Sequence, residues 1–568
     1  MKFVNPYNFI PLTKEKTKYE KNETKTEELL TGKITVEIVT KSPLFIPDSS
    51  NENAFAVESA DNEHKSYDFF KYGGEPVLPG SEIRGMLRNV YETLTGSCLS
   101  GMDDDQELVK RTNDIYQPGM IKKINGKYIL VEAERSKCRD KNQMLIGQKT
   151  DQGYFLKGEI GIKKNAITYS YFNPVTPERK VCDIEEKQFQ MIDIVLKSYQ
   201  NPKTNKKAGH NGYKEYEKEF LAFRESTEDG YFPIYYSKVT GNLIYLSPAC
   251  ITKEAYMTKV SDILAKHGNF GPCKGEERCP ACALFGIVNE KTAAASRLRF
   301  GDAKLVHEKN NMDELFWDNP VTLEELAQPK ISAAEFYLKQ PKKDAVFWTY
   351  DYYVDAKGNI HEEVPEIAGR KFYWHNTAME FKTFQKEDRN KRNKTILPLK
   401  RKVVFQEEIF FERITNEQLQ QLLAICNISN EYLDAKGEAV AGYKLGTARP
   451  LGLGSITMRV TNCVIRSLRC DENGISYQEE AVTEYAKIRD GKAIGFCPET
   501  IPPFVKMMHF DGAGNLPICY PVTDEQLAKI NNNELHTEGF KWFQDNHGGL
   551  KNREKKPQYK ESLPVVKG

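Results

Sequence analysis

The sequence has no long hydrophobic run and no excess of one charge. It holds no stretch of about 18 consecutive apolar residues, the length that a membrane-spanning helix needs. Its start has no apolar segment of signal-peptide length and soon becomes charged. Lys plus Arg number 81 and Asp plus Glu number 80, so the whole chain is not a polycation. We expect a cytoplasmic protein with no membrane partner, in which any nucleic-acid surface comes from local charge clusters.

Cysteine is also sparse, with 12 residues in 568. A chain of this length can bury a core without disulfides, and 11% aromatic residues exclude a largely disordered or collagen-like chain. Nine of the cysteines are scattered singly, which predicts buried small side chains or surface thiols in a reducing compartment. The other three lie within ten residues of one another and indicate a site.

Two parts of the chain show regular apolar periodicity. Alternation from Ile34 predicts a strand with one buried face, and the spacing changes after residue 80 to that of an amphipathic helix with Ser81 as its N-cap. After residue 400 come a strand, a helix, a glycine-rich loop and a second alternating strand. Two split units of this kind, brought together across long insertions, predict one compact α+β core.

The segments between these units define the predicted organisation. In chain order we expect a polar N-terminal arm (1–33), the first part of the core (34–100), a β-rich insertion (101–245), a metal-binding loop region that returns to the core (246–310), a second insertion (311–365), the second part of the core with the glycine-rich loop (366–465) and a C-terminal extension (466–568).

The most specific motif is HGNFGPCKGEERCPACALFG, in which His267, Cys273, Cys279 and Cys282 have the spacing H-x5-C-x5-C-x2-C. A C-x2-C pair can hold a tetrahedral ion from one turn, and a His with another Cys can complete the ligand set. Zn²⁺ prefers such ligands, and four of them would make the site closed and structural. His307 is the reserve fourth ligand, and a redox C-x2-C pair is the alternative.

The segment VLPGSEIRGMLRNV predicts an anion site at a helix start. Gly80 and Ser81 leave backbone N–H groups free where the helix dipole favours anions. Arg84 and Arg88 are four positions apart on the polar face near that end, as a phosphate clamp on an RNA backbone requires. An ordinary helix with two solvated arginines is the alternative.

The segment GTARPLGLGSI combines Gly446, Gly452 and Gly454 with Arg449. Glycines let a backbone approach a ligand closely, and the arginine supplies a charge beside them. The segment is not a P-loop, because no Gly-Lys-Ser/Thr follows. It is not a dinucleotide fingerprint either, because a strand rather than a helix comes next.

A basic stretch occupies residues 385–402, which contain eight Lys or Arg and two acidic residues and so have a local net charge of +6. Arg389 and Arg392 lie within it, and Trp374 and His375 precede it. Aromatic rings beside cations suit single-stranded RNA, so we expect an RNA contact here. A solvated loop is the alternative.

In their order along the chain, PGSEIRGMLR, CPACALFG followed by SRLRFGDAKL, and GTARPLGLGS resemble the motifs of the RAMP superfamily of CRISPR-associated proteins. The resemblance is greatest to the backbone-type subunits of type III effector complexes, and GRKFYWHN suggests a larger subtype with insertions. It covers roughly residues 34–95, 267–306 and 366–460. It implies a ferredoxin-like, RRM-type core with a zinc loop, CRISPR guide RNA and target RNA as ligands, and other effector subunits as partners.

The resemblance also implies residue roles. Ser81, Arg84 and Arg88 match the guide-contacting helix start, Cys273, Cys279 and Cys282 match the zinc loop, and Gly446, Gly452 and Gly454 match the glycine-rich loop. In catalytic subunits of the family, an Asp after the first strand cleaves target RNA with a divalent ion such as Mg²⁺ or Mn²⁺. Asp48 is the candidate here, with Asp61 and Asp68 further along. Phe45-Ile46-Pro47 replaces the family's glycine-containing turn, which counts against catalysis.

Two other functions remain open from the sequence. The chain could be an endoribonuclease that processes the CRISPR precursor transcript, with His375 beside Tyr373 as the acid–base pair. A scaffold without RNA contact would require the basic and glycine-rich segments to be coincidental.

Overall fold

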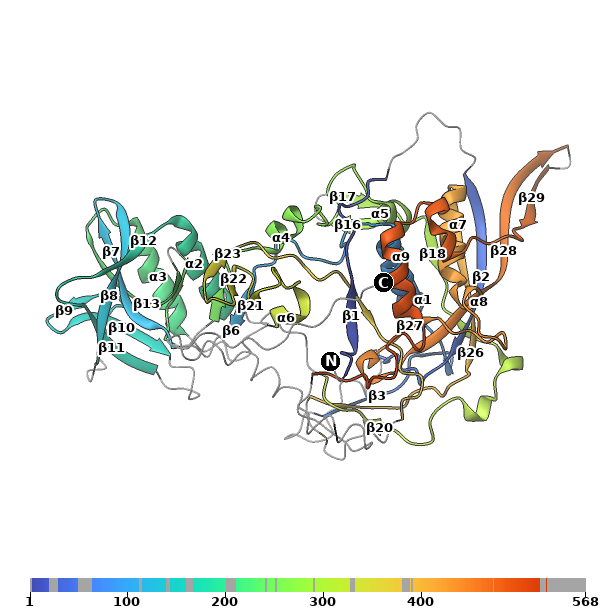
Figure 1. Cartoon of the computed structure of the whole chain (residues 1–568), viewed down its shortest axis with the longest axis horizontal. Helices are drawn as coiled ribbons and strands as arrows, with labels where there is room; N and C mark the ends of the chain where they lie inside the picture. Colours follow the sequence, from blue (N-terminus) through green and yellow to red (C-terminus); the bar gives the residue numbers. More distant parts are fainter. Residues whose placement is uncertain are drawn as a thin grey trace.

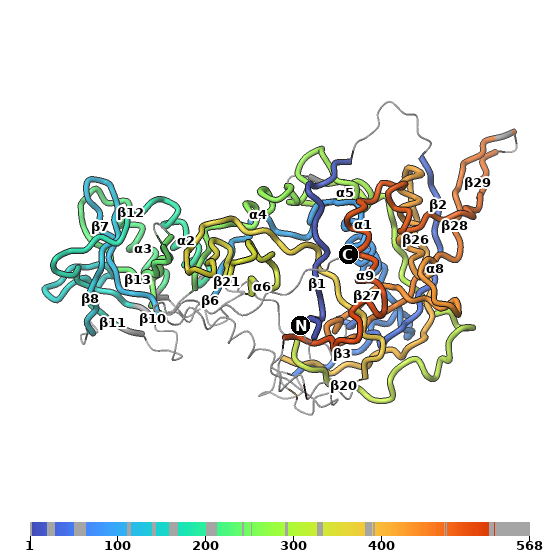
Figure 2. The backbone as a smooth tube through the Cα atoms, viewed as in Figure 1, coloured from blue at the N-terminus to red at the C-terminus, as the bar shows by residue number. Residues whose placement is uncertain are grey.

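The computed structural model shows an elongated molecule with two lobes and a narrower region between them (Figures 1 and 2). No helix among the described residues is long and apolar enough to cross a membrane. The structure describes residues 3–19, 29–49, 64–111, 115–138, 144–159, 167–200, 211–240, 243–250, 253–289, 292–326, 333–380, 389, 392–472, 474–521 and 528.

The larger lobe is built on a seven-stranded antiparallel sheet. β2 (Leu30–Thr40) lies at its centre between β26 (Val404–Ile414) and β28 (Ser455–Asp471), and β18 (Leu298–Phe300) pairs with the other side of β26. α1 (Gly80–Leu94) follows β2, and α7 (Asn416–Cys426) follows β26. This β-α-β-β-α-β order with the strand order β18-β26-β2-β28 is that of the ferredoxin-like fold. The predicted α+β class is confirmed.

Periodicity explains why these elements pack as they do. Ile34, Val36 and Ile38 alternate along β2, are fully buried and belong to the main core cluster. The same cluster takes in the apolar stripes of both helices, with Ile83 and Leu87 from α1 and leucines of α7. Burying these stripes against one face of the sheet supplies most of the hydrophobic stabilisation of the lobe.

The two core helices start differently. Thr415 caps α7, and its Oγ accepts the N–H of Gln418 at 3.2 Å. The prediction that Ser81 caps α1 is wrong, because the helix already begins at Gly80 and Asp302 accepts the Gly80 N–H at 2.8 Å from a loop far along the chain. A Cβ at Gly80 would lie 2.5 Å from the carbonyl oxygen of Gly301, so this close approach requires glycine.

The smaller lobe has its own sheet and its own core. Eight strands in the order β14-β13-β7-β8-β11-β10-β9, with β12 beside β8, pack with two helices around a cluster rich in Phe and Tyr. The elements are β7 (Gln117–Ile124), β8 (Lys127–Lys137), β9 (Lys149–Thr150), β10 (Gly153–Glu159), β11 (Ile167–Pro174), β12 (Lys180–Ile184), α2 (Glu186–Gln200), α3 (Asn211–Glu225), β13 (Gly230–Thr240) and β14 (Leu243–Ser247).

Short elements connect the lobes. β6 (Val109–Arg111) pairs with β15 (Lys253–Ala255), where Lys110 and Glu254 form a buried ion pair at 2.8 Å. The Tyr116 hydroxyl also donates to Glu254 at 2.8 Å, so the buried carboxylate is satisfied. The neighbouring elements are α4 (Val260–Lys266), α6 (Ala334–Tyr337), β21 (Ala345–Trp348), β22 (Tyr352–Asp355) and β23 (Ile360–Glu362).

Segments from both ends of the described chain join the larger lobe. In the segment predicted as a polar arm (1–33), residues 7–10 form β1 (Tyr7–Ile10), which pairs with β24 (Arg370–Tyr373), and β2 already begins at Leu30. In the predicted C-terminal extension, β28 continues into a hairpin with β29 (Gly474–Ala481), and α9 (Ile501–Met508) buries Phe504, Met507 and Met508 in the main core.

The remaining elements of this lobe are short. They are β3 (Lys65–Tyr67), β4 (Lys71–Tyr72), β5 (Glu75–Pro76), α5 (Pro280–Phe285), β16 (Ile287–Asn289), β17 (Thr292–Ala294), β19 (Lys304–Leu305), β20 (Val321–Thr322), β25 (Lys394–Ile396), α8 (Ile428–Glu431) and β27 (Tyr443–Lys444).

Candidate metal centre and glycine-rich loop

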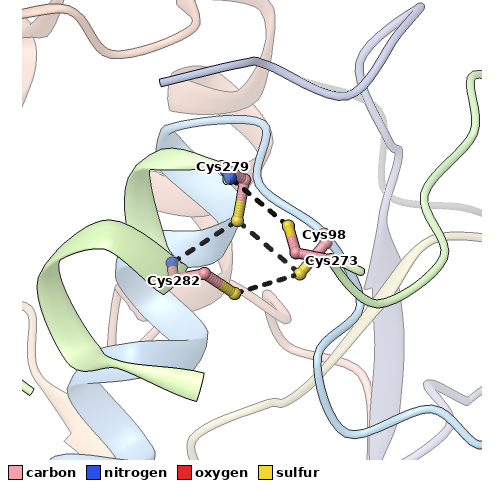
Figure 3. A group of neighbouring side chains, drawn as sticks. All are labelled: Cys98, Cys273, Cys279 and Cys282. Carbon is pink, nitrogen blue, oxygen red and sulfur yellow. Dashed lines mark hydrogen bonds between the residues drawn. The ribbon is translucent and has the colours of Figure 1, made fainter. Parts of the chain in front are cut away.

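Four buried cysteines from separate parts of the chain meet beside α1. Cys98 follows the C-terminus of α1, Cys273 lies in the loop after α4, Cys279 is the N-cap of α5, and Cys282 lies within α5. Their sulfur atoms all lie within 4.8 Å of one another and point toward a common centre (Figure 3). Four thiol groups in this arrangement form a closed tetrahedral ligand set.

The spacing of the sulfur atoms fits zinc. A Zn–S distance of about 2.3 Å places the corners of a regular tetrahedron about 3.8 Å apart. The Sγ of Cys98 lies 3.5 Å from that of Cys282 and 3.6 Å from that of Cys279. The Cys279 N–H donates to Cys273 Sγ at 3.3 Å, and the Cys282 N–H donates to Cys279 Sγ at 3.4 Å. Such donors stabilise thiolates, which are the form that binds zinc.

The fourth member of this group differs from the predicted one. His267 ends α4 and is not part of the group, although its Nε2 is buried. His307, the reserve ligand, lies with its Nε2 3.3 Å from Glu75. Cys98 takes the fourth place, although the sequence analysis counted it among the scattered cysteines. It is 184 positions from Cys282, so no local spacing could reveal it.

Two arginines and one glutamate surround the cysteine group. Arg88 donates to Glu92 at 2.9 Å and to the Cys282 sulfur at 3.6 Å. Arg370 donates to the other oxygen of Glu92 at 3.0 Å and to the Cys98 carbonyl at 2.9 Å. The Arg88 and Arg370 side chains are only 16% and 4% exposed. Because four thiolates around a dication carry net negative charge, two cations beside them favour the bound state.

The two arginines of the predicted phosphate clamp donate hydrogen bonds to backbone carbonyls of the protein itself. Arg84 donates to the Phe285 carbonyl at 2.6 Å, and Arg88 donates to the Gly286 carbonyl at 3.0 Å. Burial is the main cause that lowers the pKa of Arg84, followed by the charge of Arg88. The two side chains therefore join α1 to the C-terminal end of α5. Ser81 is exposed at the helix start, and an RNA contact by Ser81, Arg84 or Arg88 stays a prediction.

The glycine-rich loop packs against the chain itself. Gly446, Gly452 and Gly454 all have positive φ, at 78°, 97° and 82°. A Cβ at Gly446 would lie 2.4 Å from the Phe45 carbonyl oxygen, and one at Gly454 would lie 2.0 Å from that of Leu445. These close approaches within the fold account for the glycines without a ligand, so their contact with RNA also stays a prediction.

Lys444 holds the inner side of this loop. Its Nζ is buried and donates to the carbonyls of Gly452 and Leu453, each at 2.9 Å. Burial, followed by the charge of Arg449, lowers the pKa of Lys444 to about 7. The lysine therefore acts inside the loop rather than on its surface.

Trp374 and His375 lie in the interior, 5% and 2% exposed. His375 Nδ1 is 3.0 Å from the Ser455 hydroxyl, and burial holds the pKa of this histidine well below its ordinary value. Neither ring offers a face to a nucleotide in this structure, so an RNA contact by either residue would require a rearrangement and stays a prediction. Lys371 and Tyr373, in the strand β24 that precedes these two residues, are half-buried.

The acidic candidates lie at the edge of the same lobe. Asp48 is half-buried, and its N–H donates to the Asp68 carbonyl at 2.9 Å, so the two residues are neighbours. Asp68 is exposed, and Asp61 lies outside the described residues. Within the described part of the chain, no group of three or more His, Cys, Asp or Glu other than the cysteines is arranged to hold an ion.

Three segments meet at the outer side of the glycine-rich loop. Gly452 packs against Met379 and Asn376, which follow β24. Arg401, at the end of the basic stretch, donates to the Met379 carbonyl at 2.7 Å and to that of Thr377 at 3.0 Å. Arg389 and Arg392 are exposed, whereas residues 381–388, 390 and 391 lie outside the described ranges. The fold thus brings the basic stretch, the segment after β24 and the loop together.

A family model described as RAMP superfamily matches residues 37–457. The match begins within β2 and ends within β28, so it takes in β18, β26, both helices and parts of β2 and β28, together with the cysteine group and the glycine-rich loop. No curated protein matches the chain.

Proposed function

From the premise that the chain belongs to the RAMP superfamily, we propose that it is a guide-RNA-binding subunit of a type III-like CRISPR effector complex. Membership makes it a CRISPR-associated, RNA-binding protein. The finer assignment adds CRISPR guide RNA and target RNA as ligands, other effector subunits as partners and antiviral interference as the purpose. In this proposal the ferredoxin-like sheet has an RRM-type use, as a platform for single-stranded RNA.

The observation that carries this proposal is the meeting of three segments at the glycine-rich loop. Arg449 of the loop lies 4.9 Å from the ring centre of Tyr373, and Arg401 donates to the carbonyl of Thr377, four residues further along the same segment. Cations and an aromatic ring from distant parts of the chain therefore share one surface. Single-stranded RNA is recognised by this combination, because phosphates need cations and unstacked bases need rings.

The cysteine group has a structural part in the proposal. Cys98, Cys273, Cys279 and Cys282 would hold one Zn²⁺, which supplies a crosslink between α1, the loop after α4 and α5. The crosslink fixes the segment after the C-terminal end of α1 and the return of the chain to the sheet edge. Zinc with four thiolate ligands has no open position, so it takes no part in RNA chemistry.

Cleavage of target RNA is the less supported part. Asp48 and Asp68 are neighbours and could share a Mg²⁺ or Mn²⁺ with RNA phosphates, as such ions need few protein ligands. The alternative, processing of the CRISPR precursor, is less favoured because His375 is buried and its low pKa keeps it neutral. A buried imidazole cannot exchange a proton with a substrate hydroxyl without a rearrangement.

The test is RNA capture followed by defined binding. Sequencing of RNA that co-purifies with the native complex should return CRISPR repeat–spacer sequences. Purified protein should then bind repeat-containing RNA in a gel-shift assay with a steep salt dependence. Incubation with matched target in Mg²⁺, Mn²⁺ or EDTA separates binding from cleavage. Recovery of only bulk cellular RNA, with equal binding to a scrambled sequence, would contradict the proposal.

A further inference from the structure

The β1–β24 pair has two different faces. Tyr7 lies opposite Tyr373 and Phe9 opposite Lys371, so these four side chains share one face. The other face carries Phe372 and Ile10, which belong to the main core cluster. One strand thus connects the core of the larger lobe to a separate aromatic surface.

This aromatic surface is built around Tyr7. The Tyr7 ring is buried, and its centre lies 5.8 Å from that of Tyr373, 6.3 Å from that of Tyr520 and 5.9 Å from that of Phe336. Tyr337, Tyr373 and Tyr520 are only partly buried. We call these three side chains with Tyr7 the tyrosine shelf. Because β1 and Tyr520 lie outside residues 37–457, the shelf is completed by parts of the chain beyond the family match.

Two cations lie over the shelf. The Lys371 Nζ is 3.9 Å from the ring centre of Tyr7 and 5.0 Å from that of Tyr373. The Arg449 guanidinium carbon is 4.9 Å from the Tyr373 ring centre. Both side chains are half-buried, and neither forms a salt bridge with a carboxylate of the described residues. Their charge is available to an external anion.

Two other cations over rings in the described part of the chain differ on that point. Arg489 lies 5.6 Å from the ring centre of Tyr432 but is paired with Glu431 at 3.1 Å. Lys122 lies 5.2 Å from the ring centre of Tyr231 but is paired with Glu178 at 2.7 Å. A cation over an aromatic ring is thus ordinary here, whereas among the described residues only Tyr373 has two such cations, neither in an ion pair with a described carboxylate.

We infer that Lys371, Arg449 and Tyr373 form a contact site for single-stranded RNA, in which the cations bind a phosphate and the tyrosine edge takes an unstacked base. The inference rests on the proposed function for its ligand class and adds the place and the residues of contact. It replaces the buried Trp374 and His375, which follow β24, with Lys371 and Tyr373 of the strand itself.

The test compares variants in RNA binding across a range of salt concentrations, with a single-stranded repeat-containing RNA as the probe. Lys371→Gln and Arg449→Gln should each reduce the log–log salt slope by roughly 0.7, which is the value for one phosphate contact on a single strand. Tyr373→Ala should weaken binding by about tenfold through the lost contact between the ring and the base, whereas Tyr373→Phe should bind like wild type. Arg489→Gln is the matched control and should leave both quantities unchanged.

The outcomes separate this inference from the proposed function. Wild-type binding with unchanged slopes and affinities in all shelf variants overturns the shelf and leaves the function standing. Failure of the wild-type protein to bind RNA overturns both. A poly-glutamate peptide that binds wild type in a Lys371- and Arg449-dependent manner, while RNA does not, would assign the shelf to an acidic protein segment instead. The Gln variants keep long polar side chains, and melting temperatures equal to wild type show that they fold.

Discussion

Arg370 and Lys371 are adjacent in the sequence but belong to two regions with opposite electrostatics. Arg370 points into the cysteine group, where Glu92 and backbone carbonyls satisfy it. Lys371 points to the tyrosine shelf, where its Nζ lies over the rings of Tyr7 and Tyr373. The first region neutralises its charges internally, and the second presents them. Positive charge in a sequence therefore indicates a ligand only where the fold leaves it without a carboxylate partner.

The largest effect should come from removing a cysteine ligand. Cys98→Ser should lose zinc and destabilise the protein by more than about 4 kcal/mol, as loss of a structural metal does. His267→Ala is the control and should keep one zinc per chain. The measurements are metal content and melting temperature of chelator-free protein. Zinc retained in Cys98→Ser but lost in His267→Ala would restore the ligand set expected from the sequence.

The adjacent cations should give opposite phenotypes. Arg370→Met removes one partner of Glu92 in the interior and should cost about 3–5 kcal/mol, as broken buried ion pairs do. Lys371→Met should change stability by less than about 0.5 kcal/mol, because it breaks no ion pair. Denaturant unfolding of both variants measures the two stability changes, and RNA affinity measures the binding loss that the tyrosine shelf predicts for Lys371→Met. Equal stability losses in the two variants would remove the distinction between the regions.

A buried acid without a cation extends the comparison. Glu407 on β26 is 1% exposed, neither carboxylate oxygen has a hydrogen-bond partner among the described residues, and burial raises its pKa to about 9. The folded state therefore holds a proton that the unfolded state releases near its ordinary pKa. The free energy of unfolding is therefore not reduced by Glu407 at low pH, and it falls as the pH rises from about 4.5 toward 9.

Glu407→Gln should remove that loss. Between pH 6 and pH 8 the free energy of unfolding of the wild type should fall by about 3 kcal/mol, since each pH unit in this range corresponds to about 1.4 kcal/mol. The variant should not show this fall. Denaturant unfolding at the two pH values measures the difference. Parallel pH profiles for wild type and variant would show that the carboxyl group finds a partner in the native protein.

The smallest effect should follow a change of Asp48, which lies in neither region. Asp48→Ala should leave guide-RNA affinity within about twofold of wild type, because a carboxylate near phosphates repels rather than attracts them. If the complex cleaves target RNA with Mg²⁺ or Mn²⁺, the same variant should lose that cleavage. Gel-shift and cleavage assays on the assembled complex measure the two separately. Cleavage that persists would transfer the role to Asp68 or Asp61.

Much of the core was predictable because its signals are local. The alternation from Ile34 and the helical spacing after Gly80 each appear within about a dozen residues, and both describe the buried faces of β2 and α1. The spacing of Cys273, Cys279 and Cys282 likewise identified three of the four clustered cysteines. The burial of residues 371–375 was not predictable in this way, because alternation alone does not say which face of a strand is buried.

The sequence by itself determined the periodic elements, the C-x2-C ligand pair and the family to which the chain belongs. Only the tertiary structure decided that Cys98 replaces His267, that Arg88 and Arg370 are satisfied internally, and that Trp374 and His375 are buried while Lys371 and Tyr373 are half-buried. The physical reason is the same in each case. Ligand sets, ion pairs and the buried face of a strand depend on which distant segments pack together, and that is set by burying the whole core at once.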